Sequence, residues 1–436
     1  MTSLSRDSGD SRKGTHLTHS DRFLRHFSRV TSSGRFIPEI DGFRFIAIAS
    51  VFLFHLGGQM GSKSRHFTRA DAAHDWLAGF TRHGDHGVPL FFVISGFILG
   101  LPFAVQHLMG GRPVNIREFY FRRLTRLEPP YILALLLLSA ALLLIKADTF
   151  RHLLPHLLAS IFYLHNLTFG QMSTVDGVAW SLEVEIQFYL LAPVLALLFT
   201  VRDVRARRGL LIGLSVLATV LQYRFFFEDG SGPVVSVRLL MSLAYFIQYF
   251  LVGFLLADIY VTDWRQKPER HWRWDVAAIV TVGMLLFSSK FLGISHLVLP
   301  WLALALYVSV FRGVLANAVL TNRWLTTIGG MCYSIYLLHF PIISLVYRHT
   351  QSLMITHLFW PNLLLQSLIV GAATLAVSGL FFVVIEKPCM RKDWPTHLLA
   401  RLRGFIPPQG VRPRGKVMEQ KDAPENVGDR GHLKRH

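Results

Sequence analysis

The chain has 436 residues, of which 17% are charged and 52% are hydrophobic. A water-soluble chain of this length carries about 25% charged residues. The low charge, with a mean hydropathy of +0.39, therefore excludes an ordinary soluble protein. The net charge of +18 predicts contact with anionic lipid. Nucleic-acid binding is not expected, because the sequence has no compact basic domain with interleaved aromatic residues.

The two ends of the chain are polar. The first 42 residues contain no apolar core of the kind that a signal peptide needs, and we expect residues 1–38 to form a polar cytoplasmic segment. Residues 39–390 are predicted to form one transmembrane domain. Residues 391–436 are rich in Pro, Gly, Lys and Arg, which predicts a basic and largely disordered cytoplasmic tail.

The apolar segments predict an all-α polytopic membrane protein. A transmembrane helix needs roughly 20 mostly apolar residues. This criterion predicts about ten spans, which run approximately over residues 43–60, 87–106, 128–145, 178–200, 209–227, 237–259, 275–291, 294–311, 326–347 and 362–385. Residues 150–169 are interrupted by Pro155 and three histidines, so we expect this stretch to be interfacial or re-entrant.

The distribution of Lys and Arg predicts the orientation. With the N-terminus inside, the cytoplasmic segments hold 34 of these residues and the outer segments hold 8. Cytoplasmic loops of membrane proteins carry the excess of Lys and Arg. Both termini are therefore predicted to be cytoplasmic. The sequence shows no obvious internal repeat, which disfavours the transporters that are built from inverted repeats.

The first predicted span contains two ionisable residues, Arg44 and His55. Ionisable residues inside a membrane are costly, and they are candidates for function. A separation of eleven residues places the two roughly 16 Å apart along a helix and on the same side of it. A histidine at this depth is a candidate general base. The alternative is a buried histidine that a polar neighbour satisfies.

Two arginines precede the third predicted span. Arg123 and Arg126 are three residues apart, so they share one face of a helix, and Pro129 and Pro130 are expected to open the span that follows. Paired guanidinium groups suit a ligand that bears phosphates. The alternative is that both arginines only follow the charge rule for cytoplasmic loops and meet lipid headgroups.

The fourth predicted span begins with Trp180, which is expected to anchor the outer interface, and contains Glu183 and Glu185. The two carboxylates lie roughly 200° apart around a helix, so they cannot both face one site. One is expected to face the bundle, and the other a water-filled opening or a basic partner. A structural ion pair is the alternative for either one.

Two more ionisable residues lie late in the chain: His339 in the outer half of the ninth span and Glu386 at the end of the tenth. A predicted outer loop is also rich in possible metal ligands. Their spacing matches no familiar metal site, so no metal is expected from His66, His74, His83, His86, Asp71, Asp75 and Asp85.

Together these segments resemble the membrane-bound acyltransferase family 3, whose members O-acylate carbohydrates and related acceptors. The resemblance covers roughly residues 38–390. PEIDGFRFIAIASVFLFH is similar to the opening segment of the family, and it places Arg44 and His55 on the Arg-x10-His pattern. The other matching segments, in the same order as in the family, are GVPLFFVISGFIL, Arg123-x-x-Arg126, WSLEVEIQFYL with Glu185 on the acidic position, YSIYLLHFPI and Glu386-x-Pro388.

The resemblance implies an O-acyltransferase that uses acetyl-CoA or a related acyl-CoA as donor. Arg123 and Arg126 would then bind the donor, and His55 would act as general base or carry the acyl group transiently. Glu185 would orient or balance the reacting groups, and Arg44 would support the donor or form an ion pair. Supporting roles, some on the acceptor side, are expected for Trp180, Ser181, Glu183, His339 and Glu386.

The expected acceptor is a hydroxyl of a carbohydrate or glycolipid that arrives from the outer side, and the expected location is the bacterial inner membrane. A transporter or flippase of a lipid-linked sugar explains the spans and the buried charges equally well, but it leaves the joint occurrence of the motifs unexplained. A membrane-embedded sensor or scaffold leaves the buried polar groups without a role.

Overall fold

The structure is a computed structural model, and it describes residues 24–30, 36–63, 67, 75, 81, 83–227, 236–287, 294–391 and 394–395. The chain divides into two compact units, Met1–Lys392 and Asp393–His436. The described residues fall almost entirely in the first unit, and they contain helices and no strands. The all-helical fold is therefore confirmed. Most of the predicted outer loop and nearly all of the predicted tail lie outside the described residues.

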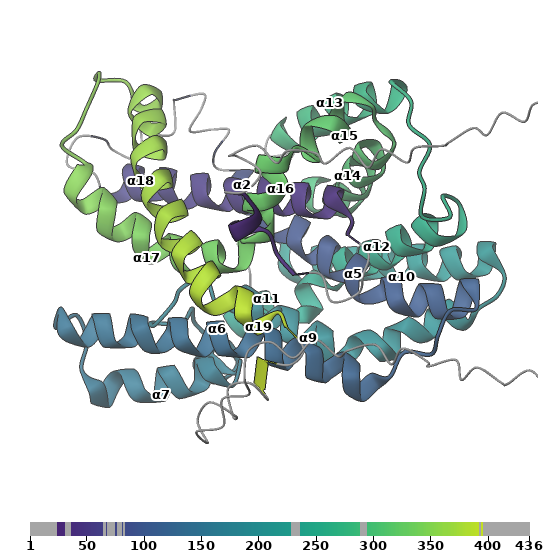
Figure 1. Ribbon diagram of the computed structural model, residues 1–436, viewed down its shortest axis with the longest axis horizontal. Helices are drawn as coiled ribbons and strands as arrows, with labels where there is room; N and C mark the ends of the chain where they lie inside the picture. The colour runs from purple at the N-terminus through teal and green to yellow at the C-terminus, as the bar shows by residue number, and fades with distance from the viewer. Residues whose placement is uncertain are drawn as a thin grey trace, which may run out of the picture. The chain divides into compact units, whose positions relative to one another are not determined.

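The first unit is built from helices of very different lengths (Figure 1). In chain order they are α2 (Pro38–Lys63), η1 (His83–His86), α5 (Gly87–Met109), α6 (Ile116–Leu144), α7 (Phe150–Ile161), α8 (His165–Phe169), α9 (Trp180–Leu195), η2 (Ala196–Thr200), α10 (Val204–Phe227), α11 (Val237–Leu240), α12 (Leu243–Thr262), α13 (Arg273–Phe287), α14 (Ile294–Arg312), α15 (Leu315–Leu320), α16 (Arg323–Gly330), α17 (Cys332–Thr350), α18 (Phe359–Phe381), the π-helical turn η4 (Phe382–Glu386) and α19 (Lys387–Cys389).

Six described helical segments are long and apolar enough to cross a membrane, and a bent pair raises this number to seven. The six are Pro38–Lys63, His83–Met109, Ile116–Leu144, Trp180–Thr200, Val237–Thr262 and Phe359–Cys389. The pair joins α16 to α17 with a bend of 73°. The expected count of about ten is not confirmed, because α10, α13 and α14 are not among these segments.

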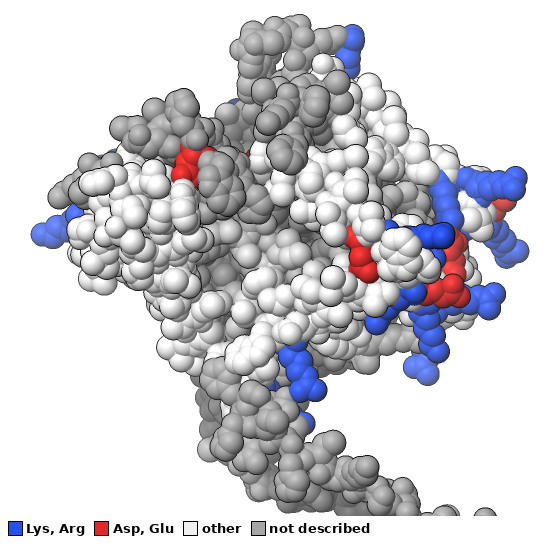
Figure 2. Space-filling model, turned by 90° about the horizontal axis from the view of Figure 1, so that it is seen from above, with Lys and Arg blue, Asp and Glu red and all other residues white. Residues whose placement is uncertain are grey.

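The surface of the first unit fits a lipid environment. Leu144, Leu368 and Ile279 expose 82%, 73% and 72% of their surface, and water penalises such large exposed apolar side chains. Figure 2 shows the largest group of Lys and Arg at one end of the visible face, with several Asp and Glu among them; smaller groups lie at other edges, and most of the described surface between them is uncharged. Exposed apolar side chains, with charges gathered toward the edges, fit an integral membrane protein.

Helices α5 and α12 pack against each other with almost no space between their backbones. A Cβ atom added to Gly96 would lie 2.3 Å from the carbonyl oxygen of Phe250, and one added to Gly253 would lie 2.4 Å from that of Val93. Small residues permit this approach in membrane bundles, where van der Waals packing drives helix association. The ring of Phe188 on α9 stacks on Phe250 with the centroids 4.0 Å apart, so α9 is fixed to the same core.

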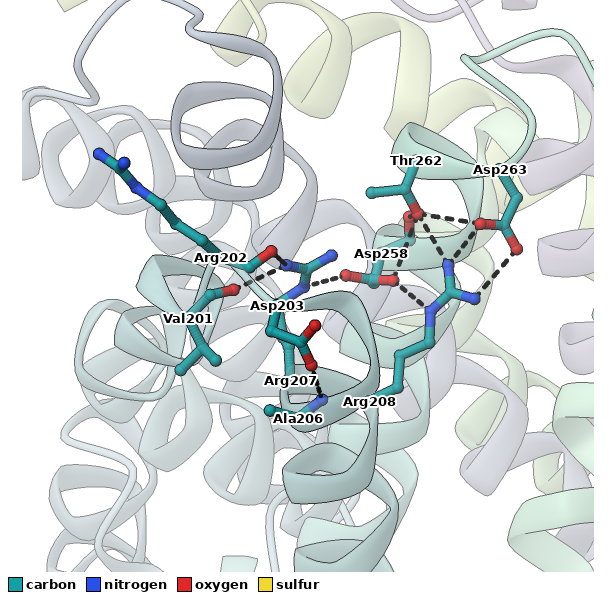
Figure 3. Close-up of polar contacts among 9 residues, drawn as sticks. All are labelled: Val201, Arg202, Asp203, Ala206, Arg207, Arg208, Asp258, Thr262 and Asp263. Carbon is teal, nitrogen blue, oxygen red and sulfur yellow. Dashed lines mark hydrogen bonds and ion pairs between the residues drawn. The ribbon is translucent and has the colours of Figure 1, made fainter.

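Helix α10 is joined to α12 by the ion-pair network of Figure 3. Arg207 and Arg208, at the start of α10, both pair with Asp258 on α12. Arg208 also pairs with Asp263 at 2.6 Å and donates to Thr262 at 2.7 Å. Arg207 and Asp258 are almost completely buried. A charge pair in such a place stabilises the fold only while both partners are present, so the network fixes α10 onto α12.

Helix α6 differs from the expectation at Pro129 and Pro130. The two prolines were predicted to open a span, but they lie inside one helix of 29 residues that begins at Ile116. A proline inside a helix removes a backbone hydrogen bond, and the surrounding helices of a membrane protein can make up for such a loss. The hydroxyl of Tyr333 donates to the carbonyl of Leu127 at 3.0 Å, just before the prolines. Arg123 and Arg126 are thus helical residues.

Candidate functional site

The cytoplasmic part of the site, in the predicted orientation, is built around Asp41 at the start of α2. Its carboxylate is fully buried and accepts from Arg44, one turn further on, at 2.8 Å. The Nε of Arg29 pairs with the other oxygen at 2.7 Å. Helix α16 packs directly on this turn, because a Cβ on Gly329 would lie 1.8 Å from the carbonyl oxygen of Asp41. Arg44 is therefore held in a fixed position by a buried carboxylate.

Arg29 is a residue that the sequence analysis missed. Burial and the nearby charges of Arg44 and Arg126 lower its pKa to about 10, and Asp41 only partly opposes this effect. Arg29 and Arg44 share the carboxylate of Asp41, and Arg126 lies near enough for its charge to act on Arg29. Arg29 lies in the segment that the sequence predicted to be polar and cytoplasmic. Asp41 could have indicated a partner such as Arg29, because a carboxylate at the start of an apolar span requires cationic partners.

Arg123 and Arg126 on α6 have no ion-pair partner within 4.0 Å among the described residues. The guanidinium of Arg123 lies over the ring of Phe119 at 4.0 Å and 5.6 Å from the ring of Tyr189, and it donates to the carbonyl of Phe119 at 3.2 Å. The Nε of Arg126 is buried without a hydrogen-bond partner in the described part of the chain. A buried donor without a partner is costly, and a phosphate oxygen would satisfy it.

Glu183 and Glu185 face different partners. Glu185 accepts from the hydroxyl of Ser95 on α5 at 2.6 Å and from the hydroxyl of Tyr189, whose ring lies near Arg123. Glu183 is buried, and it accepts from the backbone N–H of Asn166 at 3.0 Å, in the first turn of α8. Glu185 thus connects α9 to the arginines of α6, while Glu183 holds α8 in place.

The deeper part of the site contains two histidines. His55 on α2 and His339 on α17 have ring centroids 5.3 Å apart, and the ring of Phe340 lies edge-on to His55 at 5.1 Å. His339 is fully buried, and its Nδ1 lies 2.7 Å from the carbonyl oxygen of Tyr336. No hydrogen bond joins Glu185 to His55 within the described residues, so any influence of Glu185 on His55 is indirect.

Ser181 and Tyr336 form a polar pair close to the histidines. Their hydroxyls are 2.6 Å apart, and that of Tyr336 also donates to the carbonyl of Val178 at 3.0 Å. One turn before His339 on α17, Tyr336 thus ties α17 to the start of α9. The ring of Tyr336 lies 5.5 Å from that of His339 between centroids, so Tyr336 connects Ser181 to His339.

The remaining candidates have structural contacts. Trp180 packs its ring against Phe246 on α12 with the centroids 5.5 Å apart. Glu386 accepts from the backbone and the hydroxyl of Ser334, which fixes the end of α18 and η4 to α17.

Of the predicted outer-loop ligands, His66, Asp71 and His74 lie outside the described residues. The described residues contain no group of three or more His, Cys, Asp or Glu side chains that suits a metal ion.

Comparison with known proteins identifies the family of the chain. The profile of the acyltransferase domain matches residues 37–383. The chain belongs to this family. The match covers every candidate above except Arg29 and Glu386, and it includes α2, α6, α9 and α17. Together with the apolar helices, it establishes an integral membrane protein of the acyltransferase family.

Curated relatives carry the name O-acetyltransferase. The chain is 27% identical to the provisionally named O-acetyltransferase SACOL0978 of Staphylococcus aureus strain COL over 343 residues. It is 25% identical to the O-acetyltransferase OatA of Staphylococcus aureus strain NCTC 8325 / PS 47 over 350 residues. Each match covers 72% of this chain and 52% of the relative, so the chain spans about half the length of these relatives. No solved structure matches the chain.

Proposed function

We propose that the protein is an integral-membrane O-acetyltransferase. It would take an acetyl or another short acyl group from acyl-CoA on the cytoplasmic side and transfer it to a hydroxyl of a carbohydrate or glycolipid. The family and the O-acetyltransferase relatives support the reaction class. The bacterial source of these relatives supports a place in the inner membrane, with residues 39–390 as the catalytic domain between two cytoplasmic ends.

The observation that carries the proposal is the unpaired arginine pair of α6 beside the Arg29–Asp41–Arg44 cluster. Asp41 already holds Arg29 and Arg44, whereas neither Arg123 nor Arg126 forms an ion pair within 4.0 Å with a described carboxylate. Coenzyme A bears phosphates at one end and the thioester at the other. Guanidinium groups bind phosphate in a two-pronged geometry, so Arg126 and Arg123 would hold that end of the donor.

The thioester end would then reach into the bundle toward His55. Arg44 and His55 share α2, and their separation of eleven residues corresponds to roughly 16 Å. The donor would thus extend along α2 from the arginines to the histidine. Glu185 contributes on the donor side, because it fixes Tyr189 against the guanidinium of Arg123. Holding both substrates close together in the reactive orientation is itself a large part of the rate gain in such a reaction.

His55 acts on the acceptor. As a general base, it removes the proton of the acceptor hydroxyl while the oxygen attacks the thioester carbonyl, and it returns that proton to the departing sulfur. In the second form of the mechanism, a lone pair of His55 attacks the thioester carbonyl and displaces coenzyme A as a thiolate. The acceptor hydroxyl then attacks the acylated ring, which leaves as free imidazole, and the proton of the hydroxyl goes to the thiolate. Both forms need one ring nitrogen with a free lone pair, and no described residue engages either nitrogen of His55 in a hydrogen bond.

The test is His55→Ala in membranes of a producing strain supplied with [14C]acetyl-CoA. We expect the formation of alkali-labile acetyl esters to fall by about 10²–10⁴-fold, the usual contribution of a general base. His349→Ala, an exposed histidine on the same helix as His339, is the matched control and should leave ester formation unchanged. Near-normal ester formation by a folded His55→Ala protein would falsify the mechanism.

A further inference from the structure

We propose that His339 is a positioning residue for His55: it accepts a hydrogen bond from His55 and thereby fixes which nitrogen of His55 is free to act as base. The inference deepens the proposed transferase function and rests on it. It starts from the protonation of His339, which its neighbours determine.

The backbone of α17 settles the tautomer of His339. Nδ1 lies 2.7 Å from the carbonyl oxygen of Tyr336 and 3.2 Å from that of Ile335. Carbonyl oxygens only accept hydrogen bonds, so Nδ1 must carry a hydrogen. No described carboxylate lies within 4.0 Å of His339, and an uncompensated cation in a fully buried position is costly. The ring is therefore neutral, and Nε2 carries a lone pair.

This lone pair has no partner. Nε2 of His339 is buried, and none of the described residues donates to it. An acceptor atom that is withdrawn from water and left unpaired costs free energy, so we expect a hydrogen-bond donor to pair with it. The side chain is 0% exposed, which leaves a donor within the bundle as its natural partner.

His55 is that donor. The centroids of the two rings are 5.3 Å apart, a separation that permits a hydrogen bond but does not require one, because the rings of His152 and His156 lie 4.9 Å apart without such a bond among the described residues. One histidine pair of the molecule does form the bond at this range. His156 and His165 have centroids 5.0 Å apart, and their facing nitrogens, Nδ1 of His156 and Nε2 of His165, are 2.8 Å apart in a hydrogen bond. The His55–His339 pair is only 0.3 Å wider by this measure. The terminal torsion of histidine has a broad range, so a small turn of the His55 ring closes the contact.

The bond has a chemical consequence. If one nitrogen of His55 donates to His339, the other nitrogen of the neutral ring carries the lone pair and faces the remaining open side. A partner that fixes tautomer and orientation in this way is the usual support of a histidine base. When His55 takes the proton of the acceptor hydroxyl, both of its nitrogens carry hydrogen, and His339 still accepts from it. The proton then leaves with the sulfur, so His339 gains and loses none.

The test is a double-mutant cycle on ester formation from [14C]acetyl-CoA, with the envelope fraction of the producing strain as the acceptor pool. His339→Leu removes the acceptor at similar bulk, and we expect its turnover to fall about 10–100-fold, as for other supporting partners. His339→Gln keeps an acceptor oxygen near the Nε2 position and should retain most of the turnover. In the His55→Ala background, His339→Leu should cause no further loss, because residues that act as one unit are not additive.

Three controls separate the explanations. The KM for acetyl-CoA should stay within about twofold in each single variant, whereas a general loss of packing would change it together with turnover. His156→Gln breaks the other histidine pair, and it should leave turnover unchanged. Thermal unfolding identifies variants that do not fold, in which case His339→Gln alone carries the comparison with wild type.

The results that overturn the inference are equally distinct. Normal turnover in His339→Leu, or losses that multiply in the double variant, would remove the role of His339 and leave the transferase function intact. A folded wild-type protein that neither forms esters nor binds acetyl-CoA would remove the proposed function, and the inference with it.

Discussion

Two pairs of arginines in this molecule sit on helices in similar positions and have opposite environments. Arg207 and Arg208 on α10 meet Asp258 and Asp263, and of the nitrogens of Arg207 only Nη2 is left buried without a partner (Figure 3). On α6, Arg123 lies over an aromatic ring and donates to a carbonyl, and the Nε of Arg126 has no partner among the described residues. Neither arginine forms an ion pair within 4.0 Å with a described carboxylate.

Under the proposed function, this difference separates arginines that stabilise the fold from arginines that bind a ligand. A cation that the fold needs is supplied with its counter-charge by the chain itself, because an isolated buried charge is too costly. A cation that waits for an anionic ligand is left without one. By sequence alone the two pairs look alike, since both are expected in cytoplasmic segments where the charge rule operates.

The first prediction tests whether the ion pairs of α10 stabilise the fold. Arg207→Ala leaves Asp258 buried with Arg208 as its remaining partner, and loss of one member of a buried pair costs about 3–5 kcal/mol. We expect a lower unfolding temperature in detergent, measured by intrinsic fluorescence. Arg205→Ala, on an exposed position of the same helix, should have little effect. An unchanged unfolding temperature in Arg207→Ala would contradict the structural role of the network.

The second prediction concerns a buried carboxyl without a full set of partners, Asp176, in the segment before α9. Burial raises its pKa to about 7, and one of its oxygens has no partner among the described residues. A raised pKa means that this group favours folding at low pH and that the benefit is lost as pH rises from about 4 through about 7.

Asp176→Asn removes this dependence. The variant should gain stability over the wild type progressively between pH 4 and pH 7, by at most about 4 kcal/mol at the upper end. Thermal unfolding across that range measures the difference. A constant difference between the two proteins at every pH would show that Asp176 does not titrate in this window.

The third prediction uses Arg29, which belongs to both sides of the comparison because it is paired and also lies beside Arg126. Arg29→Ala leaves Asp41 with Arg44 alone, and loss of one charged hydrogen bond costs about 1–3 kcal/mol of stability. The affinity for acetyl-CoA should also fall, by about tenfold. Arg25→Ala, an exposed neighbour, is the control. A change in stability with unaltered affinity would place Arg29 with the structural arginines.

The fourth prediction concerns the arginines of α6, whose loss should change the stability of the protein least. The first prediction, on Arg207, expects the opposite result. The double variant Arg123→Ala, Arg126→Ala breaks no ion pair within 4.0 Å among the described residues. It loses the contact of Arg123 with the ring of Phe119 and removes the unpaired buried nitrogen of Arg126; these effects oppose each other, so stability should change by less than about 1 kcal/mol. Arg122→Ala, whose ion pair with Glu118 lies on the exposed side of the same helix, should behave similarly. Marked destabilisation in the double variant alone would show that the fold depends on Arg123 and Arg126.

The sequence predicts the parts of this architecture that depend on apolar length. Helices α2, α5, α9 and α18 lie where a run of roughly 20 apolar residues placed spans, because lipid enforces that rule strictly. The break between α16 and α17 and the continuous helix through Pro129 could not be predicted. Both depend on packing partners far along the chain, such as the contact of Gly329 with Asp41.

The candidate site divides in the same way. Motif spacing predicted Arg44, His55 and the arginines of α6 as parts of one site, and their roles stay a prediction. It could not show that Glu183 caps α8, since its partner is a backbone N–H of Asn166 and backbone groups leave no mark in a sequence. Nor could it show that His55 and His339 face each other, because that depends on how α2 packs on α17.

The most direct test of the central claim is a calorimetric titration of the purified protein with acetyl-CoA, comparing the wild type with the Arg123→Ala, Arg126→Ala variant. We predict that the wild type binds and that the variant binds at least about 100-fold more weakly, because two charge-assisted contacts are lost, while both proteins unfold at similar temperatures. Equal affinity in the two proteins, or no binding of acetyl-CoA and longer acyl-CoAs by a folded wild type, would contradict the account and favour a transporter.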